Sequence, residues 1–414
     1  MKKTIKILMM SASTTDNFTS FYDDFFEQVG NKLDITIEYE AVSWYHAVDV
    51  ISQKLKSDNP PDLFQLGTTW ISGYASMGFL DEVPKSSPKY EPLADWIEDL
   101  CLFEGKKVCL PWIADTLMLF ANREHMTHMN IQGKEINTTE GLLETCDRIL
   151  KAHSSDPFYE NRLPLALLIR PQHDTMNLLL PWLRSFGWDI DEVKYPLFSP
   201  ANKSGLHDFC NYLKRLMKAA RLDRNIMTRP SYAIDNEFFL DNKFTFSITR
   251  WWKLILDLYR QRDIDSRYSF THKAFPIPTG PSGSSPPFAG GSVLCVPSNA
   301  RHRVEAWAVA AELMTSEHYS NRSKMTGDTP AIDRGFWRDF EGHPRATPLY
   351  AQIQSAKHYP TSPIWLPAER VISNSIFSLV WNYIYEDKSF DQLYNTIMVN
   401  ADKRLQSISD YYWR

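Results

Sequence analysis

The chain has 414 residues, and its 43% hydrophobic content is enough to bury the cores of two or three domains. Its 45 Lys and Arg against 50 Asp and Glu give a formal charge of −5, which offers no basic field to a phosphate backbone and argues against nucleic acid as a partner. The unusual feature is the aromatic content of 13 Trp, 19 Tyr and 23 Phe, which requires several half-exposed packing sites or an aromatic-lined surface.

The first 80 residues alternate between strand and helix patterns. Strands are predicted where apolar residues cluster or alternate with polar ones, at residues 4–10, 33–39 and 62–66. The helix between the first two strands carries apolar residues at helical spacing from Phe18 to Val29, and Gly30 is placed to end it. This alternation predicts a parallel sheet with helices on its faces and a ligand site beyond the carboxyl ends of its strands.

The rest of the chain is mostly helical, with one long interruption. A helical pattern extends from about residue 116 to 262, and further helices are predicted at 304–311, 372–380 and 390–408. Residues 276–291 are crowded with Pro and Gly and form a loop longer than most in compact domains. Loops of this length are usually functional or disordered.

The cysteines and the N-terminus bear on the cellular compartment. The five cysteines are odd in number and contain no CxxC pair: Cys101, Cys109, Cys146, Cys210 and Cys295. We interpret them as free thiols. The short apolar run after the charged start has no small-residue cleavage site, and no stretch approaches the roughly 18 apolar residues of a membrane helix. We therefore expect a cytoplasmic location for the chain as given, with a periplasmic or lipid-anchored extracellular location as the alternative if a leader was removed.

The standard catalytic motifs GxGxxG, GxxxxGK[ST], HExxH and GxSxG do not occur in the sequence. His125 and His128 have the spacing nearest to a metal site, but no Cys, Asp or Glu cluster joins them in sequence. We therefore expect no metal, no cofactor and no catalytic residue. Asp115 and Glu369 could be proposed as a glycosidase pair, but sequence does not establish the spacing of about 5 to 10 Å that such a pair requires.

Short turns at the ends of predicted strands combine aromatic rings with small or hydrogen-bonding residues. These turns are Ser11-Ala12-Ser13-Thr14-Thr15, Gly67-Thr68-Thr69-Trp70, Pro111-Trp112-Ile113-Ala114-Asp115, Thr249-Arg250-Trp251-Trp252 and Phe288-Ala289-Gly290-Gly291. Aromatic faces stack on apolar C–H surfaces, whereas Asp, Arg and hydroxyl groups hydrogen-bond polar groups. The combination suits a sugar, which has one face of each kind. For any single Trp, core packing at the end of a strand is the competing interpretation.

Six segments occur in a characteristic order along the chain. They are Pro61–Gly67, Met77–Asp81, Leu110-Pro111-Trp112 with Asp115, Phe275–Pro281 with Gly290-Gly291, Ala306-Trp307 and Gly327–Ala331. Each motif is weak alone, but the ordered set resembles the extracellular solute-binding proteins of family 1, the sugar receptors of ABC importers. The resemblance spans nearly the whole chain.

This resemblance implies an α/β fold of the periplasmic-binding-protein type. Two lobes, each a mostly parallel sheet flanked by helices, would be joined by hinge strands and would close over a ligand in the cleft between them. The N-terminal lobe would contain residues 1–116 and 270–322, and the C-terminal lobe residues 117–269 and 323–414.

The resemblance also implies a non-enzymatic receptor of an ABC sugar importer that binds a mono- or oligosaccharide. The expected ligand-binding residues are Ser13, Trp44, Thr68, Thr69, Trp70, Trp112, Asp115, Arg250, Trp251, Gly290, Gly291 and Trp365. The stacking platforms among them would be Trp70, Trp112, Trp251 and Trp365. Asp115, Arg250 and the two threonines would form hydrogen bonds, and the two glycines would let the backbone approach the ligand.

Expected partners are the saccharide and either ABC permease subunits or a signalling protein, with no nucleic acid, no membrane span and a monomeric chain. Two other functions stay open. One is a leaderless cytosolic sugar sensor whose closure is read by a protein partner. The less favoured one is an enzyme that acts on glycans through Asp115, Glu369 or another carboxylate.

Overall fold

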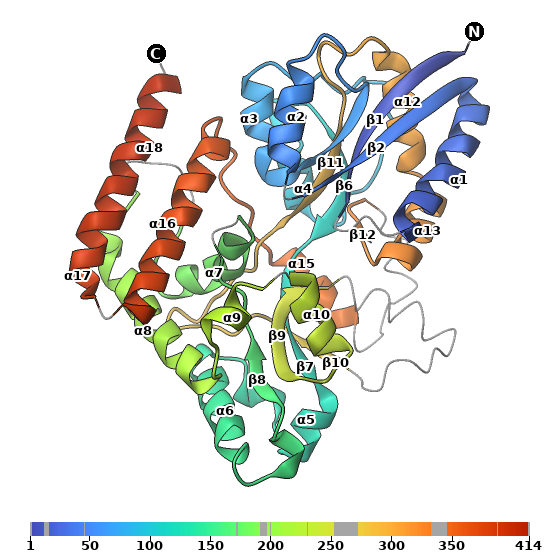
Figure 1. Cartoon of the computed structure of the whole chain (residues 1–414). Helices are drawn as coiled ribbons and strands as arrows, with labels where there is room; N and C mark the ends of the chain where they lie inside the picture. The colour runs from blue at the N-terminus through green and yellow to red at the C-terminus, as the bar shows by residue number, and fades with distance from the viewer. Residues whose placement is uncertain are drawn as a thin grey trace.

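The structure is a computed structural model that describes residues 2–11, 16–44, 46–170, 173–190, 197–198, 200–229, 231–251, 272–332, 346–386 and 388–412. These residues form two α/β lobes, each built around one sheet (Figure 1). Of the predicted ligand-binding residues, Ser13 lies outside the described part of the chain.

The first lobe contains a six-stranded sheet. Its strand order is β12 (Thr329–Pro330), β6 (Leu110–Asp115), β11 (Gly290–Cys295), β3 (Leu63–Gly67), β1 (Lys3–Ser11) and β2 (Ile35–Ser43). β1 pairs in parallel with β2 and β3, whereas β11 runs antiparallel to β3 and β6, and β12 runs antiparallel to β6. The three strands predicted before residue 70 are therefore present.

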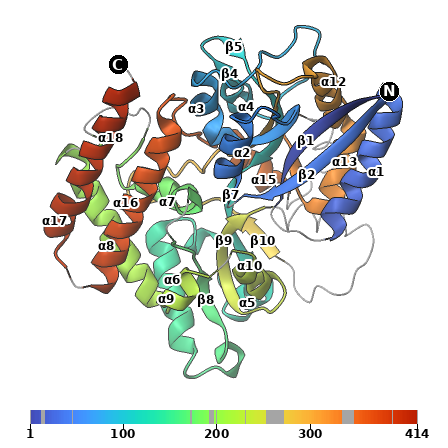
Figure 2. The same ribbon diagram turned by 45° about the horizontal axis from the view of Figure 1, so that its top comes forward.

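Helices cover both faces of this sheet (Figures 1 and 2). On one side lie α1 (Asp16–Leu33), α12 (Arg303–Leu313) and α13 (Ser316–Thr326), and on the other lie α2 (Ala47–Leu55), α3 (Ile71–Ser76) and α4 (Asp95–Leu100). The lobe also contains the hairpin of β4 (Leu102–Phe103) and β5 (Lys106–Lys107), and α15 (Ala346–Gln354) packs between the two lobes. Contrary to prediction, α1 does not end at Gly30, and the chain turns at Asp34, whose φ of 53° is left-handed.

The second lobe contains a four-stranded sheet in the order β10 (His272–Phe275), β7 (Leu117–Asn122), β9 (Phe244–Arg250) and β8 (Leu163–Ala166). Only β8 and β9 pair in parallel here. Among the described strands, two of five pairings in the first sheet and one of three in the second are parallel, which corrects the prediction of mostly parallel sheets. Two neighbouring strands can pair in parallel only when a crossover connection joins them. The strands that pass between the lobes have no such connection to their neighbours, so they pair antiparallel.

The remaining helices belong to the second lobe. They are α5 (Arg123–His128), α6 (Thr139–Ala152), α7 (His173–Ser185), α8 (Lys203–Ala219), α9 (Arg224–Met227), α10 (Ser231–Phe239), α16 (Trp365–Tyr385), α17 (Phe390–Leu393) and α18 (Val399–Tyr412). Short turns of other helix types are η1 (Thr68–Trp70), η2 (Gly133–Glu135), η3 (Pro157–Tyr159), η4 (Pro200–Asn202) and the π-helical turn Tyr394–Met398. In Figure 1, α16 to α18 stand beside α8 at the outer edge of the molecule.

The buried apolar side chains form two clusters, and one of them extends across both lobes, since it contains Phe120 of β7 and Phe244 of β9 together with residues of the first sheet. In the second lobe, the core joins α6, α8 and α16 through fully buried side chains such as Cys146, Phe209 and Ile376. Burial of a large apolar side chain stabilises the fold by about 1.5–3 kcal/mol, so these contacts attach the C-terminal helices firmly to the lobe.

Strand pairing assigns two elements differently from the predicted lobe boundaries. β10 lies after residue 270 but pairs with β7 in the second sheet. β12 lies after residue 322 but pairs with β6 in the first sheet. α15 contacts both lobes, because Gln352 Nε2 donates to the Leu117 carbonyl oxygen at 3.2 Å and the Ile353 carbonyl oxygen accepts from Trp96 Nε1 at 2.9 Å. The chain therefore passes between the lobes at Thr116, again between β10 and β11, and again between β12 and α16.

Candidate functional site

The three passages between the lobes lie side by side. Thr116 joins β6 to β7, is fully buried and donates a hydrogen bond from Oγ1 to the carbonyl oxygen of Phe288 at 2.6 Å. The next residue, Ala289, donates its N–H to the carbonyl oxygen of Lys357 at 3.0 Å, and Lys357 donates its own N–H to Pro287 at 2.9 Å. Segments far apart in sequence therefore form one hydrogen-bonded junction.

Two of the predicted polar residues meet beside this junction. Asp115 ends β6 in the first lobe, and Arg250 ends β9 in the second. The Arg250 Nε donates to Asp115 Oδ2, and the two side chains are 36% and 19% exposed. The structure thus brings these residues together as an ion pair that bridges the lobes. Partial burial lowers the local dielectric and strengthens such a pair relative to one in water.

The double glycine also lies at this junction, but its close approach is to a neighbouring strand. Gly290 and Gly291 pair with Asp115 and Ala114 of β6. The φ of Gly291 is +133°, and a Cβ there would lie 1.8 Å from the carbonyl oxygen of Ile113. Glycine is therefore required for packing of β11 on β6, and its predicted role toward a ligand stays a prediction.

Thr68, Thr69 and Trp70 form η1 directly after β3, and their role toward a ligand stays a prediction. Trp70 contacts Trp44, with ring centroids 5.9 Å apart and planes tilted by 53°. Thr68 is buried, and no described residue forms a hydrogen bond with its Oγ1. A buried hydroxyl without a partner is costly, which marks this position as one that could accept a ligand or a water.

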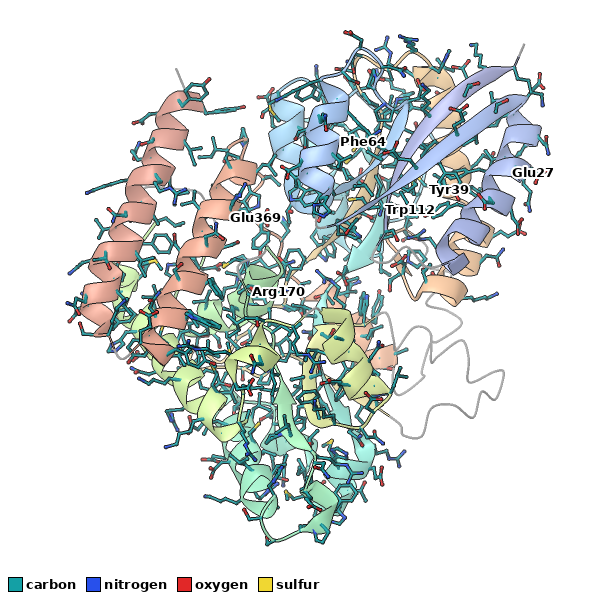
Figure 3. The ribbon with its side chains drawn as sticks, viewed as in Figure 1. Glu27, Tyr39, Phe64, Trp112, Arg170 and Glu369 are labelled. Atoms are coloured by element: carbon teal, nitrogen blue, oxygen red, sulfur yellow. The ribbon has the colours of Figure 1, made fainter. Side chains whose placement is uncertain are left out.

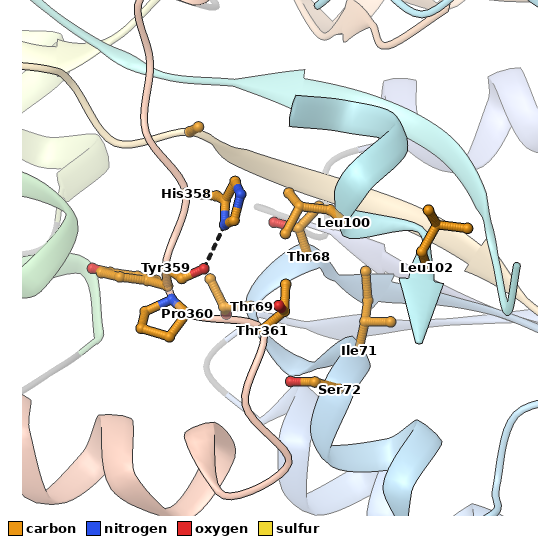
Figure 4. A pocket seen from close by; sticks show the side chains of 11 residues that line it. Thr68, Thr69, Ile71, Ser72, Leu100, Leu102, His358, Tyr359, Pro360 and Thr361 are labelled. Carbon is orange, nitrogen blue, oxygen red and sulfur yellow. Dashed lines mark hydrogen bonds between the residues drawn. The ribbon is translucent and has the colours of Figure 1, made fainter. Parts of the chain in front are cut away.

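A pocket lies between η1, α3 and the chain segment that precedes α16 (Figure 4). Its lining residues are Thr68, Thr69, Ile71, Ser72, Leu100, Leu102, Ala289, His358, Tyr359, Pro360 and Thr361. The volume open to the centre of a water molecule is about 10 Å³, which is room for about one water rather than a sugar ring. This pocket is therefore nearly filled by protein.

The predicted stacking tryptophans are packed against protein in this structure. The exposed fractions of Trp70, Trp112, Trp251 and Trp365 are 3%, 1%, 2% and 1%. Trp112, on the side of the first lobe that faces the second (Figure 3), has the Arg322 guanidinium 5.3 Å from its ring centroid. Trp365 packs on the Tyr359 ring at 4.7 Å. Their stacking on a ligand stays a prediction, and it requires movement that exposes a ring face.

Sequence reasoning missed a group of buried polar residues in the second lobe. Thr175 is buried against Arg170, whose backbone N–H donates to Thr175 Oγ1 at 2.9 Å. Asn177 accepts a hydrogen bond from the Tyr359 hydroxyl at 2.7 Å. Figure 3 shows Arg170 on the side of this lobe that faces the first, together with Glu369, which the sequence offered only as a possible catalytic carboxylate; both are more than nine-tenths buried. No local motif marks Arg170, Thr175 or Asn177, because distant segments assemble them.

A charged cluster fixes the third passage to the second lobe. Asp189 accepts from Arg184 Nε and from Lys357 Nζ, both at 2.7 Å. The Arg184 guanidinium also donates to the carbonyl oxygens of Lys357 and His358 at 3.4 Å. Burial alone would raise the pKa of the Asp189 carboxyl, but Arg184 and Lys357 outweigh it and lower the pKa. The backbone that lines the pocket is therefore anchored by ionic contacts.

The two histidines nearest to a metal spacing contact different groups. His125 is fully buried, with Nδ1 3.0 Å from Thr245 Oγ1, whereas His128 Nε2 lies 2.7 Å from Asp156 Oδ2. Within the described ranges, no group of three or more His, Cys, Asp or Glu side chains could hold a metal ion. None of the described helices is long and apolar enough to cross a membrane.

Solved structures share this fold along nearly the whole chain. An ABC transporter solute-binding protein of Thermotoga lettingae bound with α-D-tagatose has a TM-score of 0.76 at 18% identity and covers 98% of this chain and 100% of its own. T. maritima MalE3 with maltose bound has a TM-score of 0.75 at 16% identity, with the same coverage. The GacH receptor of Streptomyces glaucescens, solved unliganded and with acarbose, has a TM-score of 0.73 at 16% identity and covers 99% and 98%. These identities support the fold alone.

A curated relative is the diacetylchitobiose binding protein DasA of Streptomyces coelicolor, which is 27% identical over 125 residues. The match covers 30% of this chain and 28% of the relative, so the chain spans less than a third of that protein in the alignment. The model of the family described as bacterial extracellular solute-binding protein matches residues 21–334, more than half of the chain. By this match, together with the two-lobe fold, the chain belongs to the bacterial extracellular solute-binding protein family.

Proposed function

We propose that this chain is the receptor of an ABC sugar importer, which binds a mono- or oligosaccharide between its lobes and closes around it without changing it chemically. The observation that carries the proposal is the meeting of Asp115 and Arg250 from opposite lobes, beside the threonines and tryptophan of η1. The relatives support a carbohydrate ligand, because tagatose, maltose, acarbose and diacetylchitobiose are the compounds in their names.

The junction at Thr116 is the hinge in this proposal. The first lobe contains β1, β2, β3, β6, β11 and β12, and the second contains β7 to β10 and α16 to α18. Three hydrogen-bonded passages at one place allow rotation of one lobe against the other while each sheet stays intact. Because the described pocket holds about one water, a sugar ring enters only when the lobes move further apart.

Titration with a broad saccharide panel tests the proposal. A bound sugar contacts rings at the lobe interface, so we expect a change in tryptophan fluorescence together with a higher melting temperature. At a ligand concentration of 100 times Kd, binding to the folded state alone adds about 2.7 kcal/mol of stability. A panel in which no saccharide shifts either signal would overturn the proposal.

A matched pair of variants tests which tryptophan gives the fluorescence change. Trp70→Phe removes a ring at the proposed site and should reduce the fluorescence change. Trp188→Phe removes a ring of the second core, which stacks on Phe198 at 5.5 Å, and should leave sugar affinity intact. Recovery of the sugar intact after prolonged incubation would support binding without chemistry, and a hydrolysed or transferred product would contradict it.

A second candidate is a cytosolic sugar sensor with the same fold. The observation that favours it is the presence of five buried free thiols, which suit a reducing compartment. In this case the protein would fractionate with cytosol and its sugar-bound form would capture a protein partner. Recovery in the periplasmic or membrane-anchored fraction, together with ABC permease subunits, would favour the importer instead.

A further inference from the structure

Three of the five cysteines meet in the first lobe, away from the proposed ligand site. Cys101 follows α4, Cys109 precedes β6 and Cys295 ends β11, and all three are fully buried. β6 and β11 pair antiparallel with Leu294 opposite Leu110, and continuing that register by one residue puts Cys295 opposite Cys109. The Cys109 thiol donates to the carbonyl oxygen of Cys101, with Sγ at 3.9 Å.

The pKa shifts of these thiols reflect the same contacts. Burial raises the pKa of Cys109 well above its usual value, while its contact with the Cys101 thiol lowers the pKa and its contact with the Cys295 thiol raises it. The hydrogen bond with Cys109, followed by burial, raises the pKa of Cys101. For Cys146 and Cys210, burial alone raises the pKa, with no thiol partner involved. Cys109 therefore lies between two other thiols.

We propose that Cys109 and Cys295 form a disulfide under oxidising conditions. The Cys101 thiol lies beside this bond and can exchange with it. Directly opposed residues of antiparallel strands have Cα atoms about 4.5–5.5 Å apart. Disulfides span Cα separations of roughly 4.4–6.8 Å, so the paired strands already have the spacing that the bond requires.

Glutathione disulfide is a sufficient oxidant for this step. One protein thiolate attacks a sulfur of glutathione disulfide and releases one glutathione, and the second protein thiolate then displaces the other. Two S–H bonds of the protein are lost and one S–S bond forms, while two glutathione molecules take up both electrons and both protons. Because the thiols are buried, we expect the reaction during folding or local opening rather than in the closed native state.

The bond would connect β6 to β11 at the ends of these strands remote from Asp115 and Gly290 (Figure 1). It would restrict the unfolded chain, which raises the stability of the first lobe. Since both cysteines lie within one lobe, the link leaves rotation at the hinge unrestricted.

Peptide mapping tests the pairing directly, because trypsin separates all five cysteines. Cys101 falls in fragment 90–106, Cys109 in 108–123 and Cys295 in 274–301. The full chain is refolded from denaturant in a mixture of reduced and oxidised glutathione, alkylated and digested. We expect a linked pair of fragments 108–123 and 274–301 that dithiothreitol separates, two fewer alkylated thiols, and alkylation of Cys146 and Cys210 as before.

Two variants provide the controls. Cys109→Ser should abolish the linked pair and the rise in Tm under oxidising conditions, whereas Cys146→Ser should keep both. Near-ultraviolet circular dichroism confirms that each variant is folded, and the wild-type map does not depend on either variant. Full alkylation of all five cysteines after oxidative refolding, or a dominant link between fragments 90–106 and 108–123, would overturn the proposal.

Discussion

Asp115 and Arg250 form an ion pair between the ends of β6 and β9, one strand in each lobe. Asp115 directly precedes Thr116, where the chain first passes between the sheets, and Arg250 pairs with Leu117 directly after it. We expect this ion pair to couple the relative position of the lobes to the charge of the two side chains. A ligand that binds either group would then compete with it.

Loss of this ion pair should loosen the lobes in the absence of ligand. We expect Arg250→Met and Asp115→Asn each to increase the radius of gyration measured by small-angle X-ray scattering, with a stability loss of about 0.5–1 kcal/mol. High salt should produce the same trend in the wild type. Arg215→Met is the control, because Arg215 pairs with Glu140 within the second lobe at an exposed position. An unaltered radius in both junction variants would refute the coupling.

Substitution of Gly291 should be strongly destabilising. Gly291→Ala places a Cβ 1.8 Å from the Ile113 carbonyl oxygen at a left-handed φ of +133°, so strand β11 has to move away from β6. We expect a loss of about 3 kcal/mol or more in urea unfolding. Gly283→Ala is the matched control: its φ is +74° but nothing lies within 4 Å, so backbone strain alone should cost about 1–2 kcal/mol. Equal losses would contradict the steric argument.

The contact between α3 and α16 should be sensitive to side-chain volume. A Cβ at Gly73 would lie 2.9 Å from the Leu366 Cβ, and Ser72 Oγ donates to the Ser362 carbonyl oxygen nearby at 2.8 Å. Gly73→Val should therefore displace the start of α16 and lower both the melting temperature and the sugar affinity. Adding Leu366→Ala should restore part of the loss, with a coupling of about 0.5–3 kcal/mol. Strict additivity of the two substitutions would mean that they do not interact.

His125 should make the protein less stable in acid. Burial, followed by the charges of Arg162 and His128, lowers the pKa of His125 to about 3. The native state therefore favours the neutral ring, while the unfolded chain binds a proton below about pH 6.5, so stability is complete above that pH and declines as the pH falls toward 3. Between pH 7 and pH 5 we expect a loss of up to about 2 kcal/mol from this residue.

His125→Gln tests this assignment by urea unfolding at both pH values. The amide can still hydrogen-bond Thr245 but does not titrate, so the variant should lose less stability between pH 7 and pH 5 than the wild type. His46→Gln is the control, since His46 is exposed and belongs to the first lobe. If both variants retain the wild-type pH dependence, the acid sensitivity arises from other groups.

Local patterns predicted the elements near the N-terminus well. The alternation of residues 33–39 and the apolar residues 4–10 and 62–66 correspond to β2, β1 and β3, because strand periodicity depends on neighbouring residues. The end of α1 was less accurate: Gly30 does not stop the helix, since an Asp at position 34 adopts the left-handed turn instead. The residue at which a helix ends depends on tertiary packing as well as on propensity.

The sequence likewise predicted only part of the candidate site. Asp115, Arg250 and η1 could be singled out from turns at strand ends, and the structure brings Asp115 and Arg250 into contact. Tyr359 and Asn177, which hydrogen-bond each other across 182 residues, carry no local signal. Nor could sequence distinguish a tryptophan that faces a cleft from one such as Trp112, which is packed over Arg322.

The order of short motifs along the chain was sufficient to identify an α/β solute-binding fold, because each motif depends on a few adjacent residues. Tertiary contacts alone decided that β10 belongs to the second sheet, that β12 belongs to the first, and that the sheets are mixed. The physical reason is that strand membership depends on hydrogen bonds between segments such as Gly291 and Ala114, whose partners are separated by many residues. The same holds for burial, which is determined by the parts of the chain that pack over a side chain.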